Sequence, residues 1–271
     1  MKQNNHIWQS LEIFGDDKDR EFFTSFINDM LIGVEIKDSS TVLFFENITK
    51  TEIDKILTDQ DKIQNWEWSR IKEKNWNQAC KDFFKPIIIN DKIKILPYWE
   101  EQSQNYLNII INPALAFGTG HHETTYMMIK AMLEFNINNK SILDIGTGSG
   151  ILSILAKKKG ASQVVAIDND SLTYNNFYEN INLNNMQKKD IDFHIMDCFD
   201  INDFNYDLIF ANINLGVLEK LIPKINKVKG SLIISGILDT DEKSIIDLLN
   251  QNNKKINKKY KRNEWLCFVI E

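Results

Sequence analysis

Apolar residues in the second half of the chain fall into two alternating patterns. Short apolar runs predict buried strands, and longer segments in which apolar residues recur every three or four positions predict helices. The clearest helical period covers residues 215–228, where Pro223 is expected to kink or split the helix. The predicted strands are residues 141–145, 164–167, 192–195, 207–211 and 231–235, and the predicted helices are residues 123–135, 151–159, 171–184, 215–228 and 242–250. This alternation, from about residue 110, predicts a parallel sheet with helices on both faces, closed by a hairpin of residues 255–260 and 264–270.

The first part of the chain follows a different order. Its predicted strands are residues 7–14, 33–36, 41–45 and 66–71, and its predicted helices are residues 19–30 and 50–57. The resulting order β-α-β-β-α-β is that of a small ferredoxin-like α+β module. Residues 73–84 predict a linking helix that Pro86 stops, and residues 87–96 predict a hairpin around Asn90 and Asp91. We therefore expect an N-terminal domain over residues 1–66, a linker over residues 67–100 and an α/β domain over residues 101–271.

One turn of the larger domain carries the strongest indication of function. The sequence Asp144-Ile-Gly-Thr-Gly-Ser-Gly150 joins a predicted buried strand to the helix of residues 151–159. Its three glycines allow the backbone to approach a ligand closely and to adopt positive φ. The helix start behind them offers unpaired N–H groups to a polar or anionic group. A glycine turn alone is weak support for a site, because many such turns hold no ligand.

A second feature strengthens the prediction. Asp168 stands at the end of the next predicted strand, 22 residues after Gly146. An acid in this place of a doubly wound sheet binds ribose hydroxyls, so turn and acid together predict a nucleoside-ligand site. The alternative is that Asp168 only caps the following helix. The chain has neither the dinucleotide pattern G-x-G-x-x-G nor a G-x-x-x-x-G-K-[ST] phosphate loop.

Composition and charge argue against several other classes of protein. The chain has no run of 18 apolar residues and no signal-peptide core at its start, so we expect a cytoplasmic protein without a membrane partner. Its three cysteines are far apart, and no C-x-x-C or H-E-x-x-H motif occurs, so no disulfide framework or metal site is predicted. The net charge of −6 argues against a nucleic-acid substrate and suits a basic partner. The basic run of residues 254–262 is either a solvated strand or loop, or a patch for a polyanion.

The glycine turn resembles the first motif of the Rossmann-like methyltransferases, D-x-G-x-G-x-G, whose ligand is S-adenosylmethionine. Residues 112–125, Asn-Pro-Ala-Leu-Ala-Phe-Gly-Thr-Gly-His-His-Glu-Thr-Thr, closely resemble the signature F-G-T-G-x-H-x-T-T of the bacterial ribosomal protein L11 methyltransferases. The resemblance runs from about residue 73 onward, and the first 66 residues match only in layout. Further matching positions are Trp76, residues 84–86, Pro97, Trp99, residues 211–213, residues 235–238 and residues 264–265.

This resemblance implies a fold, a reaction and a partner. The fold is α/β, with a Rossmann-like doubly wound methyltransferase sheet and a small ferredoxin-like N-terminal domain that recognises the substrate. The catalytic domain binds S-adenosylmethionine as methyl donor. The acceptors are amino groups of ribosomal protein L11, both lysine side chains and the N-terminal α-amine. We expect a monomer that binds no nucleic acid directly.

The resemblance also implies roles for individual residues. Thr125 is the last threonine of the signature and is expected to contact the cofactor. Gly146 and Gly148 form the cofactor turn, and Gly146 lies beside the methionine end. Asp168 is expected to hold the ribose hydroxyls. Asn212 is expected to lie near both the methyl group and the incoming amine, as catalytic residue and as cofactor contact.

Each assignment has a purely structural alternative. Thr125 is also explained as an inward-facing helix threonine, and Asn212 as a turn former at a strand end. His122, which matches the signature, is also explained as a residue that packs or caps at a helix start. Asp197, at the end of the third predicted strand, matches the usual adenine position only loosely.

Two departures bear on the acceptor. The family usually has a small residue after Ala-Asn-Ile, whereas this chain has Asn214 there. Methyltransferases of base amines or glutamine amides usually carry Asn/Asp-Pro-Pro-Tyr/Phe at this place, and Ile213 and Asn214 replace both prolines. The competing hypotheses are a lysine methyltransferase with another protein substrate, an RNA methyltransferase, and a non-catalytic cofactor-binding module.

Overall fold

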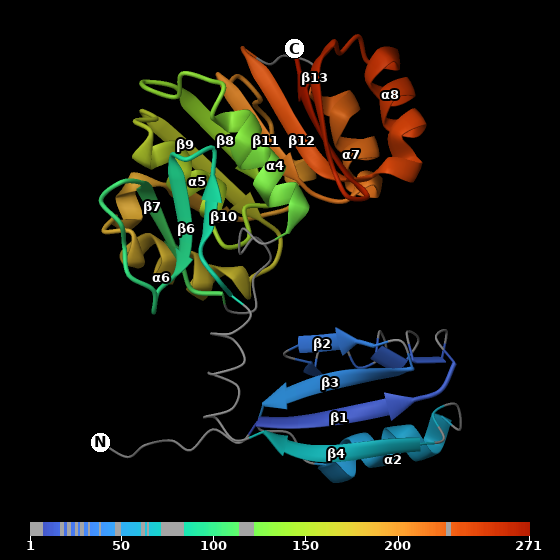
Figure 1. Cartoon of the computed structure of the whole chain (residues 1–271). Coiled ribbons are helices and arrows are strands. Elements are labelled where there is room, and N and C mark those ends of the chain that lie inside the picture. Colours follow the sequence, from blue (N-terminus) through green and yellow to red (C-terminus); the bar gives the residue numbers. More distant parts are fainter. Residues whose placement is uncertain are drawn as a thin grey trace. The chain divides into compact units, whose positions relative to one another are not determined.

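The computed structural model divides the chain into two compact units, Met1–Phe83 and Phe84–Glu271. Each unit is described here by itself (Figure 1). The structure describes residues 8–16, 19–20, 23–24, 27, 30–31, 33–37, 39–46, 50–60, 63, 65–71, 84–113, 122–225 and 229–271. The predicted linking helix of residues 73–84, with Trp76, and the signature residues 114–121 lie largely or wholly outside this description.

The N-terminal unit is an antiparallel sheet with a helix packed on it. Its elements are β1 (Trp8–Phe14), β2 (Gly33–Ile36), β3 (Ser40–Glu46), α2 (Lys50–Gln60) and β4 (Asn65–Ile71). The strand order β2-β3-β1-β4, with every neighbouring pair antiparallel, is that of a ferredoxin-like module, as the sequence predicted. The predicted helix of residues 19–30 is only partly described.

Alternation along the strands explains the core of this unit. Leu11 and Ile13 of β1 and Leu43 and Phe45 of β3 share one face and are fully buried, because successive side chains point to opposite faces. Two tryptophans of β4, Trp66 and Trp68, pack against the same core. Their Nε1 atoms both donate to Asp54 Oδ1 of α2, at 3.1 and 2.7 Å. These aromatic side chains therefore pack within the unit.

The second unit contains a seven-stranded sheet in the order β10-β9-β8-β11-β12-β14-β13 (Figure 1). Its strands are β8 (Ser141–Ile145), β9 (Gln163–Asp168), β10 (Asp192–Ile195), β11 (Leu208–Asn212), β12 (Ser231–Leu238), β13 (Ile256–Arg262) and β14 (Trp265–Ile270). The first five pair in parallel, and β14 and β13 close the sheet antiparallel. The sequence prediction of this sheet is confirmed.

Helices cover both faces of this sheet. The helices are α4 (Glu123–Met132), α5 (Ile151–Lys158), α6 (Thr173–Leu183), α7 (Leu215–Leu221) and α8 (Glu242–Gln251). Side chains of α4, α5 and α6 pack in one core and those of α7 and α8 in another. Neighbouring residues such as Ile209 and Phe210 of β11 enter opposite cores, which is why the strands read as continuous apolar runs.

Short 3₁₀ turns connect several of these elements. They cover Lys188–Asp190, Cys198–Asp200, Ile222–Lys224 and Asp239–Asp241. The predicted helix of residues 215–228 ends early, because α7 passes at Leu221 into the 3₁₀ turn that contains Pro223. This interruption is the expected effect of a proline inside a helical period.

A three-stranded sheet precedes the large one in the chain. It is formed by β5 (Ile87–Ile89), β6 (Ile93–Pro97) and β7 (Leu107–Ile111). The predicted hairpin is confirmed, with Asn90 and Asp91 at φ 50° and 51° in the turn between β5 and β6. The sequence analysis missed β7, which pairs in parallel with β6.

The basic run near the C-terminus lies on β13. Three of its lysines pair with acids at 2.6–2.7 Å, namely Lys258 with Glu134, Lys259 with Glu242, and Lys261 with Asp239. This local pairing favours the solvated-strand interpretation over a polyanion patch. No helix in the described part of the chain is long and apolar enough to cross a membrane.

Candidate functional site

The glycine turn follows β8 at the carboxyl end of the parallel strands. Gly146, Gly148 and Gly150 have φ of 69°, 52° and 80°, a region that side chains with a Cβ rarely adopt. A Cβ on Gly146 would also lie only 2.4 Å from Cγ2 of Ile213. The turn therefore needs glycine for its conformation and, at position 146, for its close approach to the end of β11.

Asp168 and the turn are joined directly. Oδ2 of Asp168, at the end of β9, accepts a hydrogen bond of 2.8 Å from the Gly148 N–H. Oδ1 accepts from the N–H of Asp170 at 3.0 Å. A carboxylate oxygen can accept more than one hydrogen bond, so Asp168 retains acceptor capacity for hydroxyl groups. The two features that the sequence analysis combined thus form one structure.

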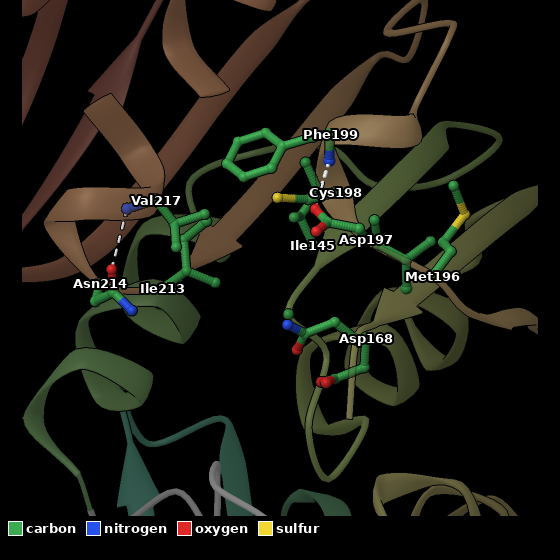
Figure 2. A pocket seen from close by; sticks show the side chains of 12 residues that line it. Ile145, Asp168, Met196, Asp197, Cys198, Phe199, Ile213, Asn214 and Val217 are labelled. Carbon is green, nitrogen blue, oxygen red and sulfur yellow. Dashed lines mark hydrogen bonds between the residues drawn. The ribbon is translucent and has the colours of Figure 1, made fainter. Parts of the chain in front are cut away.

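A cavity of about 230 Å³ lies beside this pair and is lined from the ends of several strands. Figure 2 shows Asp168 and Asp197 on one side of it and Ile213, Asn214 and Val217 on the other. Asp197 also caps the 3₁₀ turn that follows β10, since its Oδ1 accepts from Phe199 N–H at 2.9 Å. We name this space the β9–β10 cavity.

The sequence analysis missed several residues of the β9–β10 cavity. Met196, Cys198 and Phe199 line it on either side of Asp197. Burial, followed by the nearby Asp197 charge, raises the pKa of the Cys198 thiol to about 11. The thiol is therefore neutral at physiological pH and contributes to a largely apolar wall.

The charges around the β9–β10 cavity limit what it can hold. Asp168 and Asp197 line it, and no lysine or arginine is among its lining residues in the described part of the chain. A phosphate group would lack a cationic partner there. An apolar cavity with two carboxylates fits an uncharged or cationic nucleoside.

Asn212 is the last residue of β11, the strand that pairs with β8 on the side opposite to β9. Its Nδ2 atom donates to Oγ1 of Thr125 on α4, at 3.4 Å. Its Oδ1 atom is buried, and no described residue hydrogen-bonds to it. Thr125 is itself fully buried, and it lines neither the β9–β10 cavity nor the further cavity that opens at Asn212. The structure thus brings together two of the predicted site residues that are 87 positions apart.

A second cavity, of about 310 Å³, opens at Asn212. Its other lining residues are His122, Thr124, Ile213, Asn214, Gly236 and Trp265. We name it the Trp265 cavity. Ile213 and Asn214 line both cavities, so the segment after β11 separates them. The Asn214 side chain caps α7 by accepting from Val217 N–H at 3.0 Å.

His122 has both a structural role and a place in the Trp265 cavity. It is the N-cap of α4, and its Nδ1 accepts from the Thr124 N–H at 3.3 Å. Its ring meets Trp265 edge to face, with centroids 4.8 Å apart. Burial lowers the pKa of His122, so the ring is neutral at pH 7. Capping and packing of His122 were both among the sequence interpretations.

Asp144 lies beneath the turn rather than in a cavity. It is 1% exposed, and its Oδ2 accepts from the hydroxyls of Thr147 and Ser153 at 2.7 and 2.6 Å. Burial raises the pKa of Asp144 to about 6, against the lowering effect of these hydrogen bonds. Asp144 therefore ties the turn to the start of α5.

Comparisons with known proteins identify the family to which the chain is similar. The family model described as "Ribosomal protein L11 methyltransferase (PrmA)" matches residues 9–271. A relative of that name from Prochlorococcus marinus (strain MIT 9515) is 38% identical over 217 residues, 76% of this chain and 72% of the relative. Another from Clostridium perfringens (strain SM101 / Type A) is 34% identical over 210 residues, 76% of this chain and 66% of the relative.

A solved structure is similar as well. It is that of a ribosomal protein L11 methylase from Lactobacillus delbrueckii subsp. bulgaricus, at 30% identity and a TM-score of 0.64. The match covers 69% of this chain and 98% of the other.

Proposed function

The chain belongs to the ribosomal protein L11 methyltransferase family, and we propose that it transfers methyl groups from S-adenosylmethionine to amino groups of ribosomal protein L11. The acceptors in this proposal are lysine side chains and the N-terminal α-amine. Such a substrate is made in the cytoplasm, where we place the enzyme. A basic ribosomal protein also suits the net charge of −6.

The position of Asn212 carries the proposal. It lines the Trp265 cavity and adjoins Ile213, which lines both cavities. Its buried Oδ1 has no hydrogen-bond partner among the described residues, and a buried polar atom without a partner costs free energy. An amine that enters through the Trp265 cavity supplies N–H donors to this atom. Asn212 can thereby orient an acceptor nitrogen at the boundary between the two cavities.

The cofactor half of the site uses the β9–β10 cavity. Asp168 accepts from the ribose hydroxyls, Gly146 and Gly148 allow close backbone approach, and Asp197 with Phe199 surrounds the base. When bound, S-adenosylmethionine supplies a methyl group on a sulfonium, which is a good leaving group. The acidic lining tolerates that positive charge, whereas it would repel a phosphate.

The acceptor must lose a proton before it can attack. A lysine amine with an ordinary pKa of about 10.4 is only ~0.04% neutral at pH 7. Burial in the Trp265 cavity and a neighbouring positive charge both lower that pKa. An α-amine, with an ordinary pKa near 8, needs a smaller shift. Positioning by Asn212 then supplies most of the acceleration, and no dedicated base is required.

Thr125 and the N-terminal unit complete the assignment. We propose that Thr125, which the resemblance implies as a cofactor contact, acts through the amide of Asn212 that its hydroxyl binds, since it is fully buried and lines neither cavity. We assign substrate recognition to the N-terminal unit, Met1–Phe83, and methyl transfer to the unit Phe84–Glu271. We propose these bounds in place of those expected at residues 66 and 101, because β4 runs to Ile71 in the first unit and β5 begins at Ile87 in the second. A ferredoxin-like fold alone does not assign that role, so its support is the family membership.

A competition experiment tests the proposal. Labelled S-adenosylmethionine is offered with purified ribosomal protein L11, with bulk ribosomal proteins lacking L11, and with rRNA, in parallel with the Asn212→Ala variant. Label in L11 that depends on Asn212 supports the proposal. Label in another protein or in RNA would leave the assignment of the cofactor site intact and overturn the assignment of L11 as substrate. The pairing of the β13 lysines with acids makes RNA the weaker alternative.

A further inference from the structure

Three asparagines along α6 and at its C-cap bind the free edge of β7 and Asn112, the residue that follows it. Asn176, Asn180 and Asn184 recur at helical spacing and are 8%, 0% and 4% exposed. Because β7 pairs with β6 on one side only, its other edge presents N–H and C=O groups that need partners in the interior. The asparagine side chains supply them, and α6 lies beside β7 in Figure 1. We name these residues the asparagine ladder.

Asn184 and the pair Asn180 and Asn176 make the same kind of contact, in which side-chain amides bind backbone groups. Asn184 binds both backbone groups of Ile110, accepting from its N–H at 3.0 Å and donating to its carbonyl at 2.6 Å. Two residues further along the chain, Asn112 N–H donates to Asn180 Oδ1 at 2.7 Å, and Asn176 Nδ2 donates to the Asn112 carbonyl at 3.2 Å. The ladder thus fixes β7 and the first residue of the segment 112–125.

Only Asn180 also reaches the glycine turn. Its Nδ2 donates to the Ser149 carbonyl at 2.8 Å, in addition to a longer contact of 3.3 Å with Asn176 Oδ1. A fully buried side chain that makes these contacts has little freedom to rotate. Asn180 therefore holds Ser149 of the turn and Asn112 of the signature segment at a fixed distance from each other.

The Asn180 contact completes the anchoring of the turn. Gly146 and Thr147 donate to the Ile167 carbonyl at 2.9 and 3.0 Å. Gly148 donates to Asp168. The Ser149 carbonyl is held by Asn180. Successive residues of the turn are thus fixed from β9 and α6.

We propose that Asn180 is a positioning residue for the cofactor site, which holds the Asp144–Gly150 turn in its binding conformation and couples it to the start of the signature segment at Asn112. The inference rests on the proposed function, because it concerns the affinity of the same site. Asn180 does not line the cavities and acts through the turn. Its removal deletes the contacts with the Ser149 carbonyl and the Asn112 N–H together, so the turn loses preorganisation.

Asn184, the C-cap residue of α6, provides a matched control. Asn180→Ala and Asn184→Ala delete the same atoms from buried positions four residues apart. Each removes a side-chain partner of a backbone N–H, that of Asn112 just after β7 for Asn180 and that of Ile110 within β7 for Asn184. Both variants are expected to melt at lower temperature. Only Asn180→Ala removes a contact with the turn. We expect it to bind S-adenosylhomocysteine about tenfold more weakly, with Asn184→Ala close to wild type.

The experiment is calorimetric titration of S-adenosylhomocysteine into the full-length wild type and both variants, with thermal melts of each. Kinetics add a second readout, since KM for S-adenosylmethionine should rise in Asn180→Ala while kcat at saturation stays near wild type. Equal binding losses in the two alanine variants, or no loss in Asn180→Ala, would overturn the positioning role of Asn180 and leave the proposed function standing. Failure of the wild type to bind would instead remove the proposed function. The pair Asn180→Ser and Asn184→Ser carries the same comparison if an alanine variant does not fold.

Discussion

The amide of Asn212 donates to the hydroxyl of Thr125 at 3.4 Å, and this contact links the end of β11 to the first turn of α4. In this orientation of the Asn212 amide the hydroxyl of Thr125 accepts from Nδ2, and Oδ1 is left to accept from an amine. A carbonyl oxygen attracts the N–H groups of the acceptor, whereas an NH₂ group in the same place would repel them. The proposed chemistry therefore depends on Thr125 as well as on Asn212.

Replacing Thr125 with valine tests this dependence. Valine keeps the shape of threonine and removes the acceptor, so the Asn212 amide loses its fixed orientation. We expect kcat to fall roughly 3- to 10-fold, the worth of one hydrogen bond, and Thr125→Ser to restore it. The affinity for S-adenosylhomocysteine, measured by calorimetry, is the control. A large loss of that affinity in Thr125→Val would show instead that Thr125 acts mainly as a direct cofactor contact.

Asn212 and Asp168 are expected to divide catalysis and binding between them. Asn212→Ala should lower kcat by about 100-fold, because misplacement of the acceptor costs on that order, with a smaller effect on cofactor affinity. Asp168→Ala should do the reverse and weaken cofactor binding roughly 10- to 100-fold through lost charge-assisted hydrogen bonds. Steady-state kinetics and calorimetry on both variants measure this division. Equal losses of turnover and affinity in each variant would contradict it.

The burial of Asp144 predicts a pH dependence of stability. Burial raises its pKa from the ordinary 3.8 of an aspartate to about 6 in the folded protein. Between these values the folded protein binds more protons than the unfolded chain, so the free energy of unfolding falls as pH rises from about 4 to about 6. The contribution is on the order of 3 kcal/mol. Denaturation at a series of pH values should show this slope in the wild type and a reduced slope in Asp144→Asn, and equal slopes would refute the assignment.

Gly146 is expected to tolerate no side chain. A Cβ there adds strain at φ 69° and lies 2.4 Å from Ile213. We expect Gly146→Ala to lower the free energy of unfolding by about 1–3 kcal/mol and to weaken S-adenosylhomocysteine binding. Gly216→Ala is the control, because a Cβ on that α7 glycine has no neighbour closer than 3.6 Å and alanine favours helix. Similar melting temperatures for the two variants would show that the turn adapts.

The sequence predicted the large sheet well because its signals are local. Short apolar runs gave β8, β9, β10 and β11 to within a residue or so, and the acid at the end of β9 placed Asp168 beside the turn. Pro223 gave the interruption after α7 through its own chemistry. These features need no information from distant parts of the chain.

The parts that escaped prediction depend on contacts between distant residues. Trp265 lines a cavity with His122, from the opposite end of the catalytic domain's sequence, and neither position carries a local sign of that pairing. Asn180 looks like any helix asparagine in an asparagine-rich chain, and only the folded structure places it between Ser149 and Asn112. β7 is a different case, because the run Leu-Asn-Ile-Ile-Ile at residues 107–111 carries the local signal of a strand and could have been predicted from it.

Mass spectrometry of ribosomal protein L11 after incubation with this enzyme and S-adenosylmethionine tests the central claim most directly. We predict added methyl groups on lysine side chains or on the N-terminal amine of L11, and their absence when Asn212→Ala replaces the wild type. An L11 of unchanged mass after incubation with wild-type protein that demonstrably binds S-adenosylhomocysteine would contradict the account.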